Sequence, residues 1–215
     1  MINLVLIGNG GHARDIEQIV RDINYHRPTY NILARLDDSL LLNRTGSIES
    51  FKDYLDCQYS ICVNDGKVRA QIDRRLIEIA INNRSTLKPA NLIHPTAFMG
   101  SNCVYLDGIV MGPYSVITTN VRLGAHVHLN SHASINQNSM VGSYSTMSPG
   151  ARVCGDCEIG EEVNMGANSV VINVKEVGDR ATIGAGAVVI NNVQTNTTVV
   201  GVPAKRIETK EVVWG

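Results

Sequence analysis

The chain has 215 residues, 44% of them hydrophobic, which is enough for one large domain or two small ones with a buried core. Nineteen basic and twenty acidic residues give a net charge of -1, without the cationic surplus of a typical nucleic-acid or anionic-membrane binder. No run of eighteen apolar residues occurs and the first residues contain no basic signal region. We therefore expect a cytoplasmic protein that binds neither nucleic acid nor membranes.

The first 85 residues alternate between strand and helix patterns. Residues 2–7 have the composition of a buried parallel strand, and apolar residues then recur at helical spacing over 16–23. Further strands are predicted at 31–36 and 59–63, and a helix at 68–82. This pattern predicts half of a Rossmann fold, and we assign residues 1–90 to an α/β domain.

From Ile93 to Val189 every sixth residue is apolar, and the residue four positions later is usually small. Three such hexads form one eighteen-residue coil of a triangular prism, and the stretch is long enough for five to six coils. Glycine often follows the large residue, as at Gly100 and Gly112, where we expect it to help the chain turn a corner. We assign residues 91–198 to a parallel β-helix of hexapeptide repeats and 199–215 to a C-terminal tail.

A glycine-rich turn, Gly8-Asn9-Gly10-Gly11-His12-Ala13, connects the first strand to the first helix. Its backbone N–H groups and the helix N-terminus can bind a diphosphate. The ribose-binding acid that NAD proteins carry about twenty residues later is absent, which favours a nucleotide or nucleotide sugar over NAD. A purely structural tight turn is the other alternative. Asp37 and Asp38 end the second predicted strand and could contact the ligand or serve as turn residues.

Three histidines, His126, His128 and His132, lie outside the inward hexad positions, so we expect them on the outer faces of the prism, in solvent or at a subunit interface. A three-histidine metal site of the gamma-carbonic-anhydrase kind is the alternative. The single C-x-x-C pair, Cys154 and Cys157, has no second pair to complete a zinc site, and we expect no metal.

Small residues at 183–189 leave backbone groups accessible to an extended ligand, and Lys205 or Arg206 could bind its phosphates. The alternative interpretation of this stretch is the polar cap of a solenoid.

Several motifs occur in the order found in one family: the GNGGH turn, Leu36-Asp37-Asp38, Val63-Asn64-Asp65 with Arg69, the junction at 91–97, the hexads and the closing GVPAKRI. The chain resembles the bacterial hexapeptide acyltransferases of the sialic-acid O-acetyltransferase and bacillosamine-pathway N-acetyltransferase (NeuD/PglD) type. The resemblance implies a left-handed β-helix and a homotrimer. It also implies acetyl-CoA bound between neighbouring prisms and a UDP-, dTDP- or GDP-linked amino sugar on the N-terminal domain.

The resemblance assigns expected roles residue by residue. The nucleotide sugar would be surrounded by Gly10, Gly11, His12, Asp37, Asp38, Asn64 and Asp65. The coenzyme A groove would be lined by Thr146, Gly155, Ala167, Ala185, Lys205 and Arg206.

The sequence departs from the family where its general base is expected. In the stretch that begins at Asn130, the family has a histidine followed by an acid, whereas this chain has Gln137 and Asn138. An amide cannot accept a proton at neutral pH. Three explanations remain open: unaided attack by a positioned amine, substitution by His132 or His128 as base with His132 preferred, or loss of catalysis.

We predict an acetyl-CoA-dependent N-acetyltransferase that acts on a nucleotide-linked amino-dideoxy sugar for surface glycan synthesis. An amine is a stronger nucleophile than a hydroxyl, so it tolerates the loss of the base better. The alternatives are a sugar O-acetyltransferase and a non-catalytic trimer that binds a sugar nucleotide.

Overall fold

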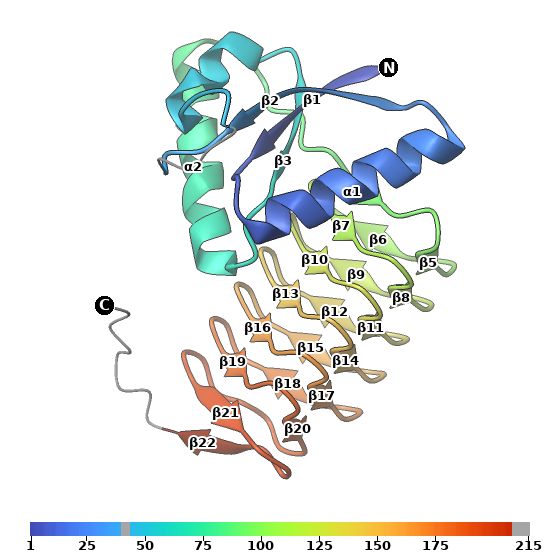
Figure 1. Cartoon of the computed structure of the whole chain (residues 1–215). Helices are drawn as coiled ribbons and strands as arrows, with labels where there is room; N and C mark the ends of the chain where they lie inside the picture. Colours follow the sequence, from blue (N-terminus) through green and yellow to red (C-terminus); the bar gives the residue numbers. More distant parts are fainter. Residues whose placement is uncertain (40–43, 208–215) are drawn as a thin grey trace.

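The computed structural model describes residues 1–39 and 44–207. An N-terminal α/β region sits at one end of a long triangular prism, and the C-terminal hairpin lies at the other end (Figure 1). The N-terminal region has strands β1 (Ile2–Ile7), β2 (Tyr30–Leu36) and β3 (Gln58–Ile61), helices α1 (Gly11–His26) and α2 (Gly66–Asn82), and the 3₁₀ helix η1 (Ile48–Tyr54). No helix among these described residues is long and apolar enough to cross a membrane.

The three N-terminal strands form a parallel sheet in the order β2-β1-β3. Alternate residues of β1 face opposite sides, as strand geometry requires. Leu4 and Leu6 pack with α1, whereas Val5 and Ile7 pack with α2 and η1. The predicted β/α alternation is thereby confirmed, and it places the carboxyl ends of all three strands at one edge of the sheet.

The prism consists of three parallel sheets, one on each side of the triangle. Sheet B contains β4 (Leu92–Ile93), β7 (Val110–Met111), β10 (His128–Leu129), β13 (Thr146–Met147), β16 (Asn164–Met165), β19 (Thr182–Ile183), β21 (Thr198–Val200) and the antiparallel β22 (Lys205–Ile207). Sheet C contains β5 (Phe98–Met99), β8 (Val116–Ile117), β11 (Ser134–Ile135), β14 (Arg152–Val153), β17 (Val170–Val171) and β20 (Val188–Val189). Sheet D contains β6 (Val104–Tyr105), β9 (Arg122–Leu123), β12 (Met140–Val141), β15 (Glu158–Ile159) and β18 (Glu176–Val177).

Residues eighteen apart pair directly between coils, for example His128 with Thr146. The large apolar hexad residues fill the interior, which confirms the predicted fold class. Most of the small residues four positions later are also buried. The hydroxyls of Ser115, Ser139 and Ser145 donate to backbone carbonyls, whereas Ser169 Oγ has no partner among the described residues. Ser145 Oγ, for instance, donates to Gly160 O at 2.8 Å. Buried hydroxyls are tolerated because each such bond offsets the loss of water.

The corners correct our expectation about glycine. From residue 102 to 186 every sixth residue has left-handed backbone, two positions after the hexad position that often carries glycine. Most residues with this backbone are not glycine. Asn102 and Tyr114, for example, have φ values of 58° and 56°. Gly142 has no positive φ, and a Cβ on it would strike the backbone of the next coil at Gly160. These glycines therefore permit close stacking of coils rather than the turn itself.

One corner carries a residue that is poorly suited to left-handed backbone. Val174 has φ 59° and is exposed, and its branched Cβ makes this conformation costly by about 1–2 kcal/mol. We expect Val174→Asn to raise the midpoint of thermal unfolding. The reverse change at an equivalent exposed corner, Asn102→Val, should lower it. Equal midpoints for both variants and the parent chain would contradict this account of the corners.

Candidate active site

The glycine turn is held in place by backbone and carboxylate contacts. Gly8 has φ 110°, and a Cβ there would press on Cys62 O and Val63. The N–H of Asn9 donates to Asp37 Oδ2 at 2.6 Å. Gly10 caps α1 without a side-chain bond. The first N–H groups of the helix therefore point outward from a fixed turn, as an anion site requires.

A first cavity of about 320 Å³ opens beside Gly8 at the carboxyl edge of the small sheet. Asp37 and Asp38 line it from the loop after β2, and Arg75 lines it from α2. Arg75 Nη1 donates to Asp38 Oδ2 at 2.5 Å, and this guanidinium holds the pKa of Asp38 below its ordinary value. Ligands of open α/β sheets bind at this edge.

A second cavity of about 260 Å³ lies between α1 and the prism, on the other side of the turn. His12 and Asp15 line it from α1, and Asn130 and Ser131 line it from the prism. Its floor is apolar, with Val110 among the contributing residues. The two cavities therefore flank the start of α1.

His12 is oriented by a second histidine. Its Nε2 lies 3.1 Å from Nδ1 of the fully buried His128. Burial, and secondarily the nearby charge of Arg69, lower the pKa of His12 from 6.5 to about 4. The same causes lower the pKa of His128 well below its ordinary value. Both rings are therefore neutral at physiological pH.

Arg69 is the buried cation that joins the two parts of the chain. Its guanidinium donates to Val63 O at 2.7 Å on the N-terminal side and to Tyr144 O at 2.7 Å on the prism. Further bonds reach His126 O at 3.0 Å and Thr146 Oγ1 at 2.9 Å. Burial lowers the pKa of Arg69 to about 9, so it keeps its charge at neutral pH.

Asp73 gathers a second buried group beside Arg69. It accepts from Tyr59 at 2.9 Å and Tyr144 at 2.7 Å, and His126 Nε2 lies 3.3 Å away. The ring of His126 stacks on Tyr144 with an interplanar angle of 7°. The expectation that His126 and His128 lie in solvent or at a subunit interface is wrong. Both rings do lie outside the prism interior, but the N-terminal region covers that face of sheet B.

Other predicted residues meet at the same junction. Asn130 Nδ2 lies 3.2 Å from Asn64 Oδ1, so an expected catalytic residue contacts an expected substrate residue. Thr146 is fully buried and donates to Asn64 O at 2.8 Å, so its hydroxyl does not face an open groove as we had expected. Asp65 caps α2 by accepting from the N–H of Val68 at 3.0 Å.

A column of small residues runs down the corner between sheets B and C. Ser131, Pro149, Ala167 and Ala185 occupy successive coils, and hydrogen bonds join these coils, such as Gly186 N to Ala167 O at 2.8 Å. The column starts at the second cavity. Lys205 and Arg206 are exposed on β22, at the far end of sheet B (Figure 1).

Gln137, Asn138 and Gly155 lie at a different corner, between sheets C and D. The side chain of Gln137 lies so close over Gly155 that a Cβ there would strike it. Asn138 donates to Asp156 at 2.9 Å and accepts from Asn120 at 3.1 Å, a double role that a carboxylate could not fill. One chain therefore does not bring Gln137 to the cavity at Asn130.

His132 occupies the same corner as the small-residue column. It stands one residue after Ser131, which lines the second cavity. Its ring stacks on Tyr114, with centroids 5.3 Å apart and an interplanar angle of 15°.

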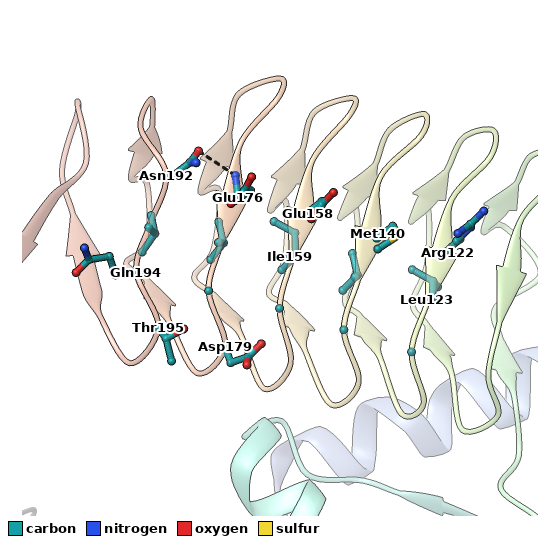
Figure 2. Close-up of a pocket in the computed structure, with 17 residues that line it drawn as sticks. Arg122, Leu123, Met140, Glu158, Ile159, Glu176, Asp179, Asn192, Gln194 and Thr195 are labelled. Atoms are coloured by element: carbon teal, nitrogen blue, oxygen red, sulfur yellow. Dashed lines mark hydrogen bonds between the residues drawn. The ribbon is translucent and has the colours of Figure 1, made fainter.

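A further hollow, of about 1120 Å³, is an open groove along sheet D. Figure 2 shows Arg122, Met140, Glu158 and Glu176 along it, with Asn192 bonded to the N–H of Glu176 at 3.1 Å. None of the predicted site residues lines this groove. We therefore take the first and second cavities, which adjoin the glycine turn, as the candidate active site.

Sequence reasoning missed Asp73 and treated Arg69 only as a motif residue. A charged pair four residues apart in a helix is normally a solvated surface pair, so no local signal marks these two as buried. Among the described residues, no group of three potential metal ligands lies close enough to hold an ion.

No family model matches the chain. It is 24% identical over 158 residues to a GDP-perosamine N-acetyltransferase of Escherichia coli O157:H7, covering 70% of this chain and 69% of that protein. PerB from Caulobacter crescentus, solved with CoA and GDP-perosamine, matches with a TM-score of 0.85 at 21% identity, over 96% of this chain and 97% of that chain. The acetyltransferase domain of PglB from Neisseria gonorrhoeae FA1090 matches with a TM-score of 0.84 at 26% identity, over 95% and 99%.

These matches confirm the predicted resemblance to sugar N-acetyltransferases of the hexapeptide-repeat type. The relatives are acyltransferases, in agreement with the predicted enzyme class. The PglB domain was also solved with acetyl coenzyme A, in agreement with the predicted acyl donor.

The neutral state of His12 makes stability depend on pH. Its pKa is about 4 when folded and 6.5 when unfolded, so between these values the unfolded chain binds more protons. The contribution of His12 to the free energy of unfolding is therefore complete above pH 6.5 and is lost as the pH falls toward 4. We expect His12 to account for a fall of about 2 kcal/mol in the free energy of unfolding from pH 7 to pH 5.

Denaturant titrations at several pH values test this expectation. His12→Gln should flatten the pH dependence by that amount. An unchanged slope in His12→Gln would contradict the burial of a neutral ring.

Proposed function

We propose that the protein is an acetyl-CoA-dependent N-acetyltransferase whose acceptor is an amino-dideoxy sugar linked to a nucleoside diphosphate. The observation that carries the proposal is the pair of cavities on either side of the glycine turn. A nucleotide sugar has the same three-part form, with a diphosphate between a nucleoside and a sugar. The diphosphate would lie on the N–H groups of Gly10 and Gly11, the nucleoside beside Asp38 and the sugar beside His12.

The second cavity suits a deoxygenated amino sugar. Asp15 contributes a carboxylate that makes no ion pair with another described residue, and the neutral His12 adds no competing cation. An ammonium group is therefore favoured there. The apolar floor, formed by residues such as Val110 and Leu129, fits ring carbons that lack hydroxyls.

Acetyl-CoA would extend along the small-residue column toward the C-terminal hairpin. Ala167 and Ala185 leave the backbone of the corner accessible to an extended arm, and Lys205 and Arg206 would bind its phosphates. Because the column begins at the second cavity, the thioester end of the arm would reach the sugar amine.

The reaction joins the amine nitrogen to the thioester carbonyl carbon. The bond between that carbon and sulfur breaks, and the departing thiolate takes the proton that the amine loses. The Gln137 side chain lies over Gly155, and its amide supplies no base. Positioning of the two reactants then provides most of the acceleration. Because Gln137 and Asn130 lie at different corners, we propose that a homotrimer brings the Gln137 corner of one copy to the cavity of its neighbour.

One other function and one other mechanism have specific observations behind them. A non-catalytic sugar-nucleotide-binding trimer is motivated by the amides at 137 and 138. Catalysis with His132 as the base is motivated by its place beside Ser131, at the corner that carries the column. His132→Ala with unchanged turnover would exclude that role.

The direct test is thiol release from acetyl-CoA with UDP-, dTDP- and GDP-linked 3- and 4-amino sugars, followed by mass measurement of the products. We expect turnover with one of these acceptors and a product heavier by one acetyl group. Nucleotide-sugar binding by calorimetry without thiol release from any acceptor would establish the non-catalytic alternative.

Restoring the histidine tests how the native site works. We expect Gln137→His to raise kcat at least tenfold and to introduce a rise in rate near pH 6.5, because a positioned base adds general-base catalysis. Gln137→Asn keeps an amide and should show neither change. A Gln137→His variant with unchanged kcat and pH profile would place the proton acceptor elsewhere.

A further inference from the structure

The second cavity contains a histidine pair that the reaction described above does not use. His12 is the second residue of α1 and lines this cavity, whereas His128 lies on β10 and is fully buried. His12 Nε2 lies 3.1 Å from His128 Nδ1, and the two ring centroids are 5.3 Å apart. The other ring nitrogen of His12, Nδ1, has no hydrogen-bond partner among the described residues. One nitrogen of His12 is therefore held by the prism, while the other is available to a molecule in the cavity.

This arrangement is the one in which proteins present a histidine as a base. A catalytic imidazole donates from one nitrogen to a fixed acceptor, and the lone pair of the other nitrogen is directed at the substrate. His128 Nδ1 can accept from His12 Nε2–H because burial keeps the His128 ring neutral. The proton of His128 is then on its Nε2, which has no partner in the part of the chain that the structure describes. His12 Nδ1 thus keeps a lone pair at the cavity wall.

We propose that His12 is the general base of the acetyl transfer and that His128 positions it. The sugar amine attacks the thioester carbon in its neutral form, and its nitrogen becomes positively charged and acidic as the C–N bond forms. The nitrogen gives one proton to His12 Nδ1. The C–S bond breaks with its electron pair on sulfur, and the His12 imidazolium passes the proton to the thiolate. The products are an amide, a thiol and a neutral His12.

The charges around His12 suit this task. Burial, and secondarily Arg69 on α2, lower the pKa of His12 to about 4, whereas Asp15 on α1 acts in the opposite direction. The ring is therefore neutral at pH 7 and can accept a proton. A thiol has an ordinary pKa of about 8.5, so the protonated ring readily gives its proton to a thiolate. A diphosphate on the N–H groups of Gly10 and Gly11 would add negative charge beside His12 and raise its pKa in the complex.

Steady-state kinetics with the acceptor that gives thiol release, combined with calorimetry of nucleotide-sugar binding, test the proposal. His12→Asn keeps a polar side chain at the cavity but cannot carry a proton. We expect kcat at pH 7 to fall at least about a hundredfold, and the Kd of the nucleotide sugar to change by less than about threefold. His12→Gln should show the same loss and serves as the second variant if His12→Asn unfolds. His26→Asn, at the exposed end of the same helix, should keep the kcat of the parent chain.

Two further measurements distinguish a base from a structural residue. The kcat of the parent chain should rise with pH along a limb whose midpoint lies above pH 4, and His12→Asn should lack this limb. His128→Asn keeps an acceptor for His12 Nε2–H, whereas His128→Leu removes it. We expect the kcat of His128→Leu to be at least about tenfold below that of His128→Asn. The His12 variants decide the question if a variant of the buried His128 unfolds.

The proposal rests on the proposed function, because it names the proton carrier of the same reaction, but the two can fail separately. An undiminished kcat in His12→Asn, or a reduced kcat with the pH limb retained, would overturn the assignment of the base alone. A loss confined to nucleotide-sugar affinity would make His12 a binding residue and would also overturn it. If the parent chain binds a nucleotide sugar but releases no thiol with any acceptor, the proposed function itself is overturned.

Discussion

A buried positive charge connects the two halves of this molecule. The Arg69 side chain is fully buried and is surrounded mainly by carbonyl oxygens, some from the N-terminal region and some from the prism. A buried guanidinium without hydrogen-bond acceptors would cost several kcal/mol. The carbonyl oxygens must therefore keep their positions around Arg69. That requirement fixes the orientation of α2 against the corner at Tyr144. The contact acts together with the His12–His128 and Asp22–His94 contacts, which join α1 to the prism.

The same charge acts on its surroundings through space. It disfavours protonation of His12 and His128, which already lose water on burial. Two neutral imidazoles can share one hydrogen bond, whereas two imidazolium rings at 3.1 Å would repel each other. The cation that joins the two halves therefore also helps to keep His12 uncharged in the wall of the second cavity, where Asp15 and Asp22 are the acidic lining residues.

Much of the architecture could be predicted from the sequence because it rests on short-range periodicity. The hexads determine which residues face inward, and the alternation of strand and helix patterns gives the small sheet. What could not be predicted depends on contacts between distant segments. No local sequence pattern predicts that α1 covers His128 or that the Thr146 hydroxyl donates to Asn64 O. The partner residues lie 116 and 82 positions away in the sequence. The expected role of the hexad glycines was wrong for the same reason, because the contact that requires a glycine is made with the next coil.

The prism also has a property that follows from its stacking. From Ser131 to Ala185 the small-residue column spans three coils, or about 14 Å at the usual separation of neighbouring strands. An insertion or deletion of one whole coil would keep every side chain on its face and change only this length, by about 4.8 Å. If acetyl-CoA lies along this column as proposed, the number of coils would set the length of the site for its flexible arm, and a chain with one coil more or fewer would suit an arm of different length.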